Sequence, residues 1–247
     1  WQNDLSISLE RLGSVEAVAG NVAAAKALFD NKLQIDLRLT EIDPTQTKWH
    51  RDLSISYEKI GNVAQAAGDF AAARSAYEAS LAIRQRLAAS DPGNALWQRD
   101  LSVSQNTIGE IAQASGDLAT ARSAYQASHA ILQRLAERDP RNVGWQRDLS
   151  VSHEKIGDVA QAAGDLAAAR SAYAASLAIR ERLAASDTGN AGWQRDVWVS
   201  YWKMAQLGDP DYPWSRVLAK LEAMQAAGTL APVDMGAVDE ARRLAAG

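Results

Sequence analysis

Cysteine is absent from the 247-residue sequence, which also holds only three histidines and six prolines. Without cysteine the chain forms no disulfide, has no thiol nucleophile and offers no sulfur ligand to zinc or iron. The histidines, His50, His129 and His153, stand at unrelated positions, which indicates solvated surface residues rather than a metal site. No run of about 18 apolar residues occurs, so no membrane-spanning helix is expected. These absences predict no metal, no cofactor and no membrane partner.

Basic residues are fewer than acidic ones, with 26 Lys and Arg against 30 Asp and Glu, so the net charge is −4. A nucleic-acid-binding domain usually carries a basic excess, so nucleic acid is not an expected partner. His153 and Glu154 begin a His-Glu-x-x-His zinc pattern, but Gly157 takes the place of the second histidine. No phosphate-binding glycine loop or serine nucleophile elbow is present. The sequence therefore predicts that this chain is not an enzyme.

Alanine, with 49 residues, is abundant, and the sequence repeats with a period of 48. Tryptophan returns at that interval at Trp1, Trp49, Trp97, Trp145 and Trp193. The second and fourth repeats differ at only 9 of 48 aligned positions. Such a period predicts a solenoid in which each repeat buries a face against its neighbours. We expect one continuous domain over 1–247, with repeats at 1–48, 49–96, 97–144 and 145–192, and a degenerate fifth repeat with capping helices at 193–247.

Each repeat has the pattern of two helices of roughly 20 residues. In repeat two, Leu53, Ile60 and Ala64 share one helical face. Gly68 then ends the first helix, and Asp69 caps the second. Sustained strand alternation is absent. The sequence therefore predicts an all-α protein built from helix pairs.

The recurring set Tyr57, Ile60, Gly61, Ala73 and Tyr77 resembles the tetratricopeptide repeat (TPR) family. We expect the glycine to allow close approach of the alanine twelve residues later, with the aromatic residue beside it. The 48-residue period exceeds the 34 residues usual for that family, so the repeats are similar to the extended ones of kinesin light chain. The resemblance implies an all-α fold, a right-handed α-solenoid of antiparallel helix pairs that forms a TPR-like superhelix.

The resemblance also implies a concave groove lined by first-helix residues. Carried onto this sequence, the expected partner-binding positions are Glu10, Glu58, Lys59, Asn62, Gln65, Asn106, Glu110, Gln113, Glu154, Lys155, Asp158, Gln161, Trp202, Lys203 and Gln206, with Arg11, Ser14 and Ala17 beside Glu10. The glutamines at 65, 113 and 161 form a ladder suited to an extended peptide backbone. The Lys and Asn clamp with which some members hold a C-terminal carboxylate is absent. The groove charges have both signs, so binding is expected to depend only weakly on salt.

Other recurring residues are expected to be structural. Trp97 should pack on Leu87 of the preceding repeat, and the other tryptophans of the series likewise. Arg51 and its copies should each reach a carboxylate in a neighbouring repeat, because adjacent residues on a helix do not face each other. Second-helix arginines, Arg84 and Arg180 among them, are expected on a solvated convex face.

The sequence near the C-terminus predicts helices that cap the solenoid. Residues 209–213 have the pattern of a helix start, Gly228 ends that helix, and Pro232 begins a last helix. Trp202 is expected in the core of this cap or, alternatively, as an aromatic anchor at the end of the groove.

The expected function is a non-catalytic scaffold, cytoplasmic, that binds a peptide or protein partner through the groove. Two alternatives stand beside it. The first is a self-assembling array, joined end to end or as a dimer through an uncapped first repeat. The second is a regulatory or sensor region of a larger effector, with a further domain before Trp1; only such a domain would make the protein an enzyme.

Overall fold

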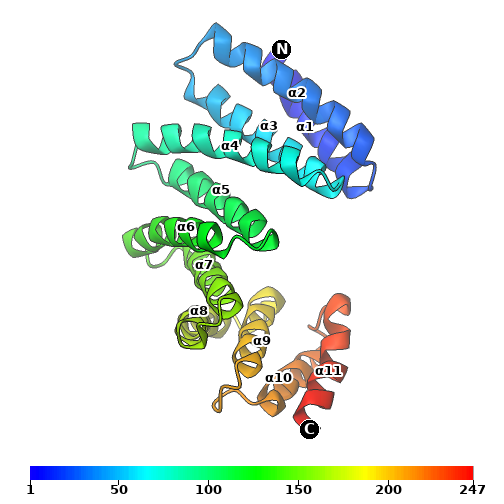
Figure 1. Ribbon diagram of the computed structural model, residues 1–247. Helices are drawn as coiled ribbons and strands as arrows, with labels where there is room; N and C mark the ends of the chain where they lie inside the picture. The colour runs from blue at the N-terminus through cyan, green and yellow to red at the C-terminus, as the bar shows by residue number, and fades with distance from the viewer. Residues whose placement is uncertain (247) are drawn as a thin grey trace. The chain divides into compact units, whose positions relative to one another are not determined.

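The structure, a computed structural model, describes residues 1–246, and within that range it has eleven α-helices, one short 3-10 helix and no strand (Figure 1). The helices are α1 (Gln2–Val18), α2 (Val22–Ile42), α3 (Thr47–Ala66), α4 (Phe70–Ser90), α5 (Ala95–Ala114), α6 (Leu118–Arg138), α7 (Val143–Ala162), α8 (Leu166–Ser186), α9 (Ala191–Gln206), α10 (Trp214–Ala226), η1 (Pro232–Asp234) and α11 (Met235–Ala246). They follow one another as pairs joined by short turns, which confirms the predicted all-α class.

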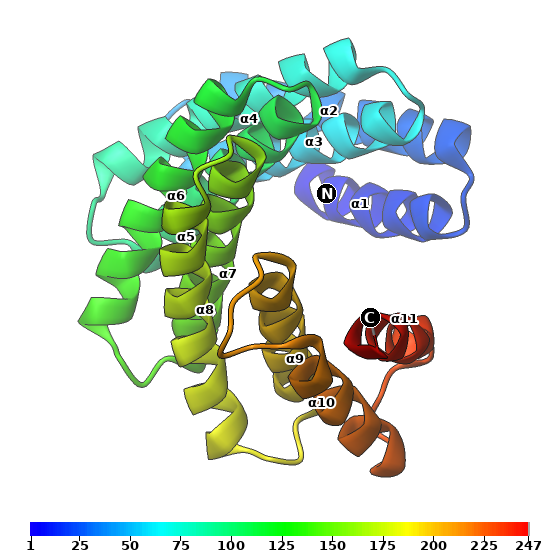
Figure 2. The same cartoon turned by 60° about the horizontal axis from the view of Figure 1, so that its bottom comes forward.

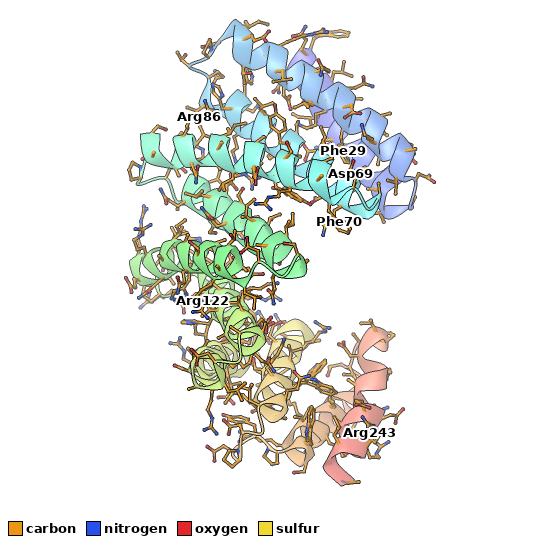
Figure 3. All side chains as sticks on the ribbon, viewed as in Figure 1. Phe29, Asp69, Phe70, Arg86, Arg122 and Arg243 are labelled. Atoms are coloured by element: carbon orange, nitrogen blue, oxygen red, sulfur yellow. The ribbon has the colours of Figure 1, made fainter. Side chains whose placement is uncertain are left out.

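The turn between the two helices of a repeat depends on glycine and an acidic cap. Gly68 has φ +79°, a left-handed conformation that L side chains adopt only at a cost. Asp69 follows, and its side chain accepts a hydrogen bond from the amide of Ala72 in the first turn of α4 (Figure 3). That bond satisfies one of the amides left free at a helix start. The sequence prediction for this turn is confirmed.

Removing this cap should weaken α4. We expect Asp69→Ala to lower the free energy of unfolding by ~1 kcal/mol, because the amide of Ala72 loses its acceptor. Asp69→Asn, whose side-chain oxygen accepts the same bond, should stay close to wild type. Urea unfolding followed by circular dichroism measures both. Equal losses for the two variants would assign the effect to charge rather than to capping.

The helices gather into two compact parts, residues 1–131 and the residues from 132 onward. In the N-terminal part, α2 packs against both α1 and α3, and α4 packs against both α3 and α5. Each second helix thus lies between its own first helix and the first helix of the following repeat. One such contact joins Trp97 to Leu53 and Leu87, which confirms the predicted place of this tryptophan. Trp1, in contrast, is fully exposed.

The mid-helix glycines make room for an aromatic ring. A Cβ atom on Gly61 would lie 2.6 Å from the ring of Tyr77, and one on Gly109 would lie 2.5 Å from the ring of Tyr125. The expected close approach therefore exists, but the ring and not the alanine is the nearest neighbour of the glycine. Ala73 is fully buried beside Tyr77.

In the C-terminal part, α9, α10 and α11 close the chain (Figure 2). Val217 and Leu221 of α10 are fully buried with Trp198 of α9 and with Val238 and Ala241 of α11. The helix start predicted at 209–213 is confirmed, because Pro213 is the N-cap of α10, which begins at Trp214. The predicted last helix is confirmed, since η1 begins at Pro232 and α11 follows it.

Candidate functional site

An open apolar pocket of about 230 Å³ lies between α1, α2 and α3. Its apolar lining includes Val18, Val22, Phe29 and Val63. The predicted groove positions of repeats one and two that line it are Ser14, Ala17, Lys59 and Asn62. The structure thus brings these residues of neighbouring first helices together around one hollow, with apolar side chains within it and polar ones beside them.

Beyond this pocket, tyrosine hydroxyls of second helices bind the amides of the predicted groove. The Tyr77 hydroxyl lies 2.6 Å from Asn62 Oδ1 and 3.1 Å from Gln65 Oε1. Tyr125 donates to Gln113 Oε1 at 3.0 Å in the same way. Burial, with the nearby charges of Glu58 and Glu110, raises the pKa of Tyr77 to about 12, so this hydroxyl stays protonated at neutral pH.

These contacts fix how the glutamines are presented. Their carbonyl oxygens are turned toward the tyrosines, and the NH2 groups of Gln65 and Gln113 have no acceptor among residues 1–246. Gln65 is exposed and Gln113 is half-buried. The amide ladder therefore presents hydrogen-bond donors, which suit the carbonyl oxygens of an extended chain.

Repeat four builds the same arrangement around Tyr173, in the C-terminal part. Its hydroxyl lies 2.7 Å from Asp158 Oδ1 and 2.9 Å from Gln161 Oε1. Lys203 of α9 pairs with Asp158 at 2.8 Å, and its ammonium lies 5.8 Å from the centre of the Tyr173 ring. Burial and the hydrogen bond to Asp158 raise the pKa of Tyr173 above its ordinary value. Three predicted groove residues thus meet around one tyrosine.

Repeat one lacks this hydrogen-bond network, and the pocket between α1, α2 and α3 lies at the equivalent position. Phe29 occupies the tyrosine position and has no hydroxyl, while Ser14 and Ala17 occupy the two acceptor positions. The short side chains leave space that amides fill elsewhere, and the phenyl ring of Phe29, labelled in Figure 3, lines this space. The pocket is therefore a consequence of three linked sequence differences in the first repeat.

The second-helix arginines were predicted to be solvated, and for Arg84 this is wrong. Arg84 is only 4% exposed. Its guanidinium pairs with Glu58 at 2.5 Å and donates to Ser54 Oγ at 3.2 Å and to Ser104 Oγ at 2.9 Å. It also donates to the carbonyl of Asp100 at 3.2 Å. A buried cation therefore ties α3, α4 and α5 together beneath the predicted groove.

Arg180 repeats this arrangement in the C-terminal part and corrects the same prediction. It is 4% exposed, pairs with Glu154 at 2.5 Å and donates to Ser200 Oγ at 2.9 Å. The sequence prediction treated Glu58 and Glu154 as charges of the groove. Their carboxylates are already neutralised by the buried Arg84 and Arg180. The other second-helix arginines Arg74, Arg86, Arg170 and Arg182 are exposed, as predicted.

Repeat one has a different buried ion pair beneath the predicted groove. Lys32 and Asp36 are each 1% exposed, and the Lys32 ammonium lies 2.7 Å from Asp36 Oδ2 and 3.6 Å from Glu10 Oε2. Asp36 also accepts from Ser6 at 2.6 Å and from Ser56 at 2.5 Å. Sequence reasoning missed both residues, although their spacing of four on one helix was a signal for an ion pair.

The remaining predicted positions differ in exposure. Trp202 is half-buried, with T-shaped contacts to Trp198 at 6.1 Å and to Trp214 at 4.8 Å between ring centroids. Of its two expected places, the structure supports the core of the cap. Gln206 and Glu110 are exposed, and Asn106 and Lys155 are half-buried.

Arg51 and its copy Arg147 behave as predicted. Arg51 Nε donates to Asp100 at 2.5 Å, and Arg147 Nε donates to Asp196 at 2.8 Å. Each pair joins first helices of successive repeats. Across residues 1–246, no group of three or more His, Asp or Glu is placed to hold a metal ion. In the same range, no helix is long and apolar enough to cross a membrane.

Comparisons with known proteins agree with this geometry. Residues 55–92 match the tetratricopeptide repeat family. The fold is similar to the crystal structure of BtubC (BKLC) from P. vanneervenii, with a TM-score of 0.65 and 15% identity over 88% of this chain and 80% of that one. It is also similar to nearly identical TPR-like repeats from a Podosopora anserina kinesin-light-chain candidate, with a TM-score of 0.61 and 17% identity over 91% of this chain and 96% of that one. No curated protein matches the chain by sequence.

The class is therefore that of helical-repeat proteins built from antiparallel pairs. More particularly, residues 55–92 match the tetratricopeptide repeat model, and the helix pairs share the fold of TPR and kinesin-light-chain-like repeat proteins, as the sequence resemblance predicted. TPR proteins are generally scaffolds for protein–protein interaction.

Proposed function

We propose that this protein is a non-catalytic binding module that holds an extended segment of a partner protein along its first helices. The observation that carries the proposal is the pocket between α1, α2 and α3. Its apolar lining suits one large apolar side chain of the segment. The NH2 groups of Gln65 and Gln113 supply donors for the segment's backbone carbonyls.

The charges beside the pocket favour a segment with an acidic group. Lys59 lines the pocket, and no carboxylate among residues 1–246 pairs with it. Glu58, the neighbouring acidic residue, is neutralised by the buried Arg84. An acidic group next to the apolar side chain would therefore meet an unpaired ammonium without opposing charge. A single such contact adds orientation and modest affinity.

Filling the pocket should weaken this binding. A peptide selected from a random library on the immobilised protein serves as probe, and its affinity is measured by fluorescence anisotropy. We expect Ala17→Trp to weaken binding at least ~10-fold, because the indole occupies the space of the anchoring side chain; this corresponds to ~1.4 kcal/mol. Ala17 is exposed, so the substitution should leave the fold intact.

Two further variants complete the test. Ala71→Trp, at an exposed position of the second helix α4, should bind the peptide as the wild type does. The double variant Gln65→Ala, Gln113→Ala should weaken binding if these amides hold the backbone. A peptide that all these proteins bind equally well would place the binding surface elsewhere and contradict the proposal.

A further inference from the structure

A lysine of α10 stands at a position where repeats two to four have a buried alanine. Lys220 follows Ala172 by 48 residues, and Ala76, Ala124 and Ala172 are 7%, 6% and 8% exposed. The corresponding residue of repeat one, Leu28, is also uncharged. Lys220 itself is half-buried. The fifth repeat therefore places a half-buried amine where the other repeats have no charge.

The amine of Lys220 is held by an amide rather than by an acid. Its Nζ donates to Gln194 Oε1 of α9 at 2.5 Å. Gln194 is fixed in turn, because its Nε2 donates to the carbonyls of Ala184 at 3.1 Å and Thr188 at 3.4 Å. Among residues 132–246, no carboxylate forms an ion pair with Lys220. The one polar contact of this amine is thus with a neutral oxygen.

Other lysines of the chain are held differently. The Nζ atoms of Lys26, Lys32 and Lys203 lie 2.7, 2.7 and 2.8 Å from aspartate carboxylates. A carboxylate favours the charged ammonium form, whereas an amide oxygen also accepts a hydrogen bond from a neutral amine. The contact with Gln194 therefore orients the amine of Lys220 without requiring its proton.

One acidic residue acts on Lys220 from the neighbouring helix α8. The carboxylate of Glu181 accepts from the Tyr201 hydroxyl at 2.9 Å, and its charge favours the ammonium form of Lys220. Burial has the larger effect and lowers the pKa of Lys220. More of this residue is therefore a neutral amine than in an ordinary lysine, and the neutral amine is the nucleophilic form.

A second cation lies one helical turn before this amine. Arg216 and Lys220 are four residues apart on α10, so their side chains are neighbours on one face. The Arg216 guanidinium lies 4.8 and 4.4 Å from the ring centroids of Tyr201 and Tyr212, and it donates to the carbonyl of Asp211 at 3.0 Å. Among residues 132–246, no carboxylate forms an ion pair with it. A positioned guanidinium of this kind suits a phosphate group.

We propose that Lys220 is a modification site that small acyl phosphates acylate, and that Arg216 binds the phosphate group of the donor. The neutral Nζ attacks the acyl carbonyl carbon and forms a C–N bond. The bond from this carbon to the phosphate oxygen breaks, and the departing phosphate takes up the proton that the nitrogen releases. The amide product has lost the charge but keeps one N–H for Gln194. This site is independent of the proposed binding of a partner segment.

The rates of acetylation at the individual lysines test the reactivity of this amine. The chain is incubated with acetyl phosphate in mildly alkaline buffer, and the acetylated peptides are quantified by mass spectrometry over time. We expect Lys220 to react at least ~3-fold faster than the exposed Lys48, because more of it is in the nucleophilic form. A rate at Lys220 equal to or below that at Lys48 would overturn the proposal.

Arg216→Gln tests the binding of the phosphate group. We expect this variant to be acetylated at Lys220 at least ~5-fold more slowly by acetyl phosphate, because the donor loses its cationic contact. The uncharged N-hydroxysuccinimide ester of acetic acid should acetylate Lys220 at the wild-type rate. Arg243→Gln, on the exposed surface of α11, is the matched control and should change neither rate. An equal change with both reagents, or no change with acetyl phosphate, would contradict the role of Arg216.

Discussion

Gly61→Ala is expected to destabilise the protein, although alanine is the better helix former by about 1 kcal/mol. The added Cβ would lie 2.6 Å from the ring of Tyr77, which is 3% exposed and whose hydroxyl is bound by Asn62 and Gln65. Overpacking of this kind costs ~1–3 kcal/mol, so the steric cost outweighs the gain in helix propensity. Denaturant unfolding followed by circular dichroism would show the loss.

The chain supplies both a control and a compensating change. Gly236, in α11, has open space where a Cβ atom would stand, with no neighbouring atom within 4 Å, so Gly236→Ala should be neutral or slightly stabilising. In the fifth repeat, Ala205 replaces the glycine, and Leu221 stands at the position of the aromatic residue. Gly61→Ala combined with Tyr77→Leu should therefore recover part of the stability that Gly61→Ala loses. A double variant as unstable as the sum of the two single ones would contradict this size matching.

The repeat made much of the fold predictable. A period of 48 fixed which residues are equivalent, and equivalent residues must satisfy the same packing, so the helix pairs, the Gly68 turn and the Arg51 contact followed from the sequence. The partner of Gly61 was less certain, because two residues of the second helix, Ala73 and Tyr77, were both candidates for the close approach. Only the geometry shows that the ring is nearest.

The site was less predictable because its chemistry depends on residues beneath the surface. Arg84 has the helical spacing of the buried residues Tyr77, Ser80 and Leu87, but its charge favoured a solvated position. Its burial depends on four acceptors on two other helices, which the sequence pattern does not reveal. The pocket beside Phe29 also arises from what is missing, a hydroxyl and two amides. A comparison of repeats detects such differences as departures, but it does not show whether the space is filled or open.

Arg84→Leu is expected to have the second large effect, a loss of ~3 kcal/mol in the free energy of unfolding. The substitution leaves the Glu58 carboxylate, whose side chain is 27% exposed, without its cation. It also removes the donors to Ser104 and to the carbonyl of Asp100. The exposed Arg86, two residues away on α4, is the control, and Arg86→Leu should change stability by no more than ~0.5 kcal/mol.

The third repeat shows how the cost can be relieved, since Asn106 and Leu132 stand at the positions of Glu58 and Arg84. Both charged residues of the pair are thus replaced by uncharged ones in this repeat. Glu58→Asn combined with Arg84→Leu should therefore be more stable than Arg84→Leu alone, because no unpaired carboxylate remains. A coupling energy near zero in this double-mutant cycle would mean that Arg84 acts through its serine and carbonyl contacts alone. A large coupling energy would show that Glu58 and Arg84 stabilise the fold as a pair. The acidic residue at position 58 would then be required by the buried cation rather than by a ligand.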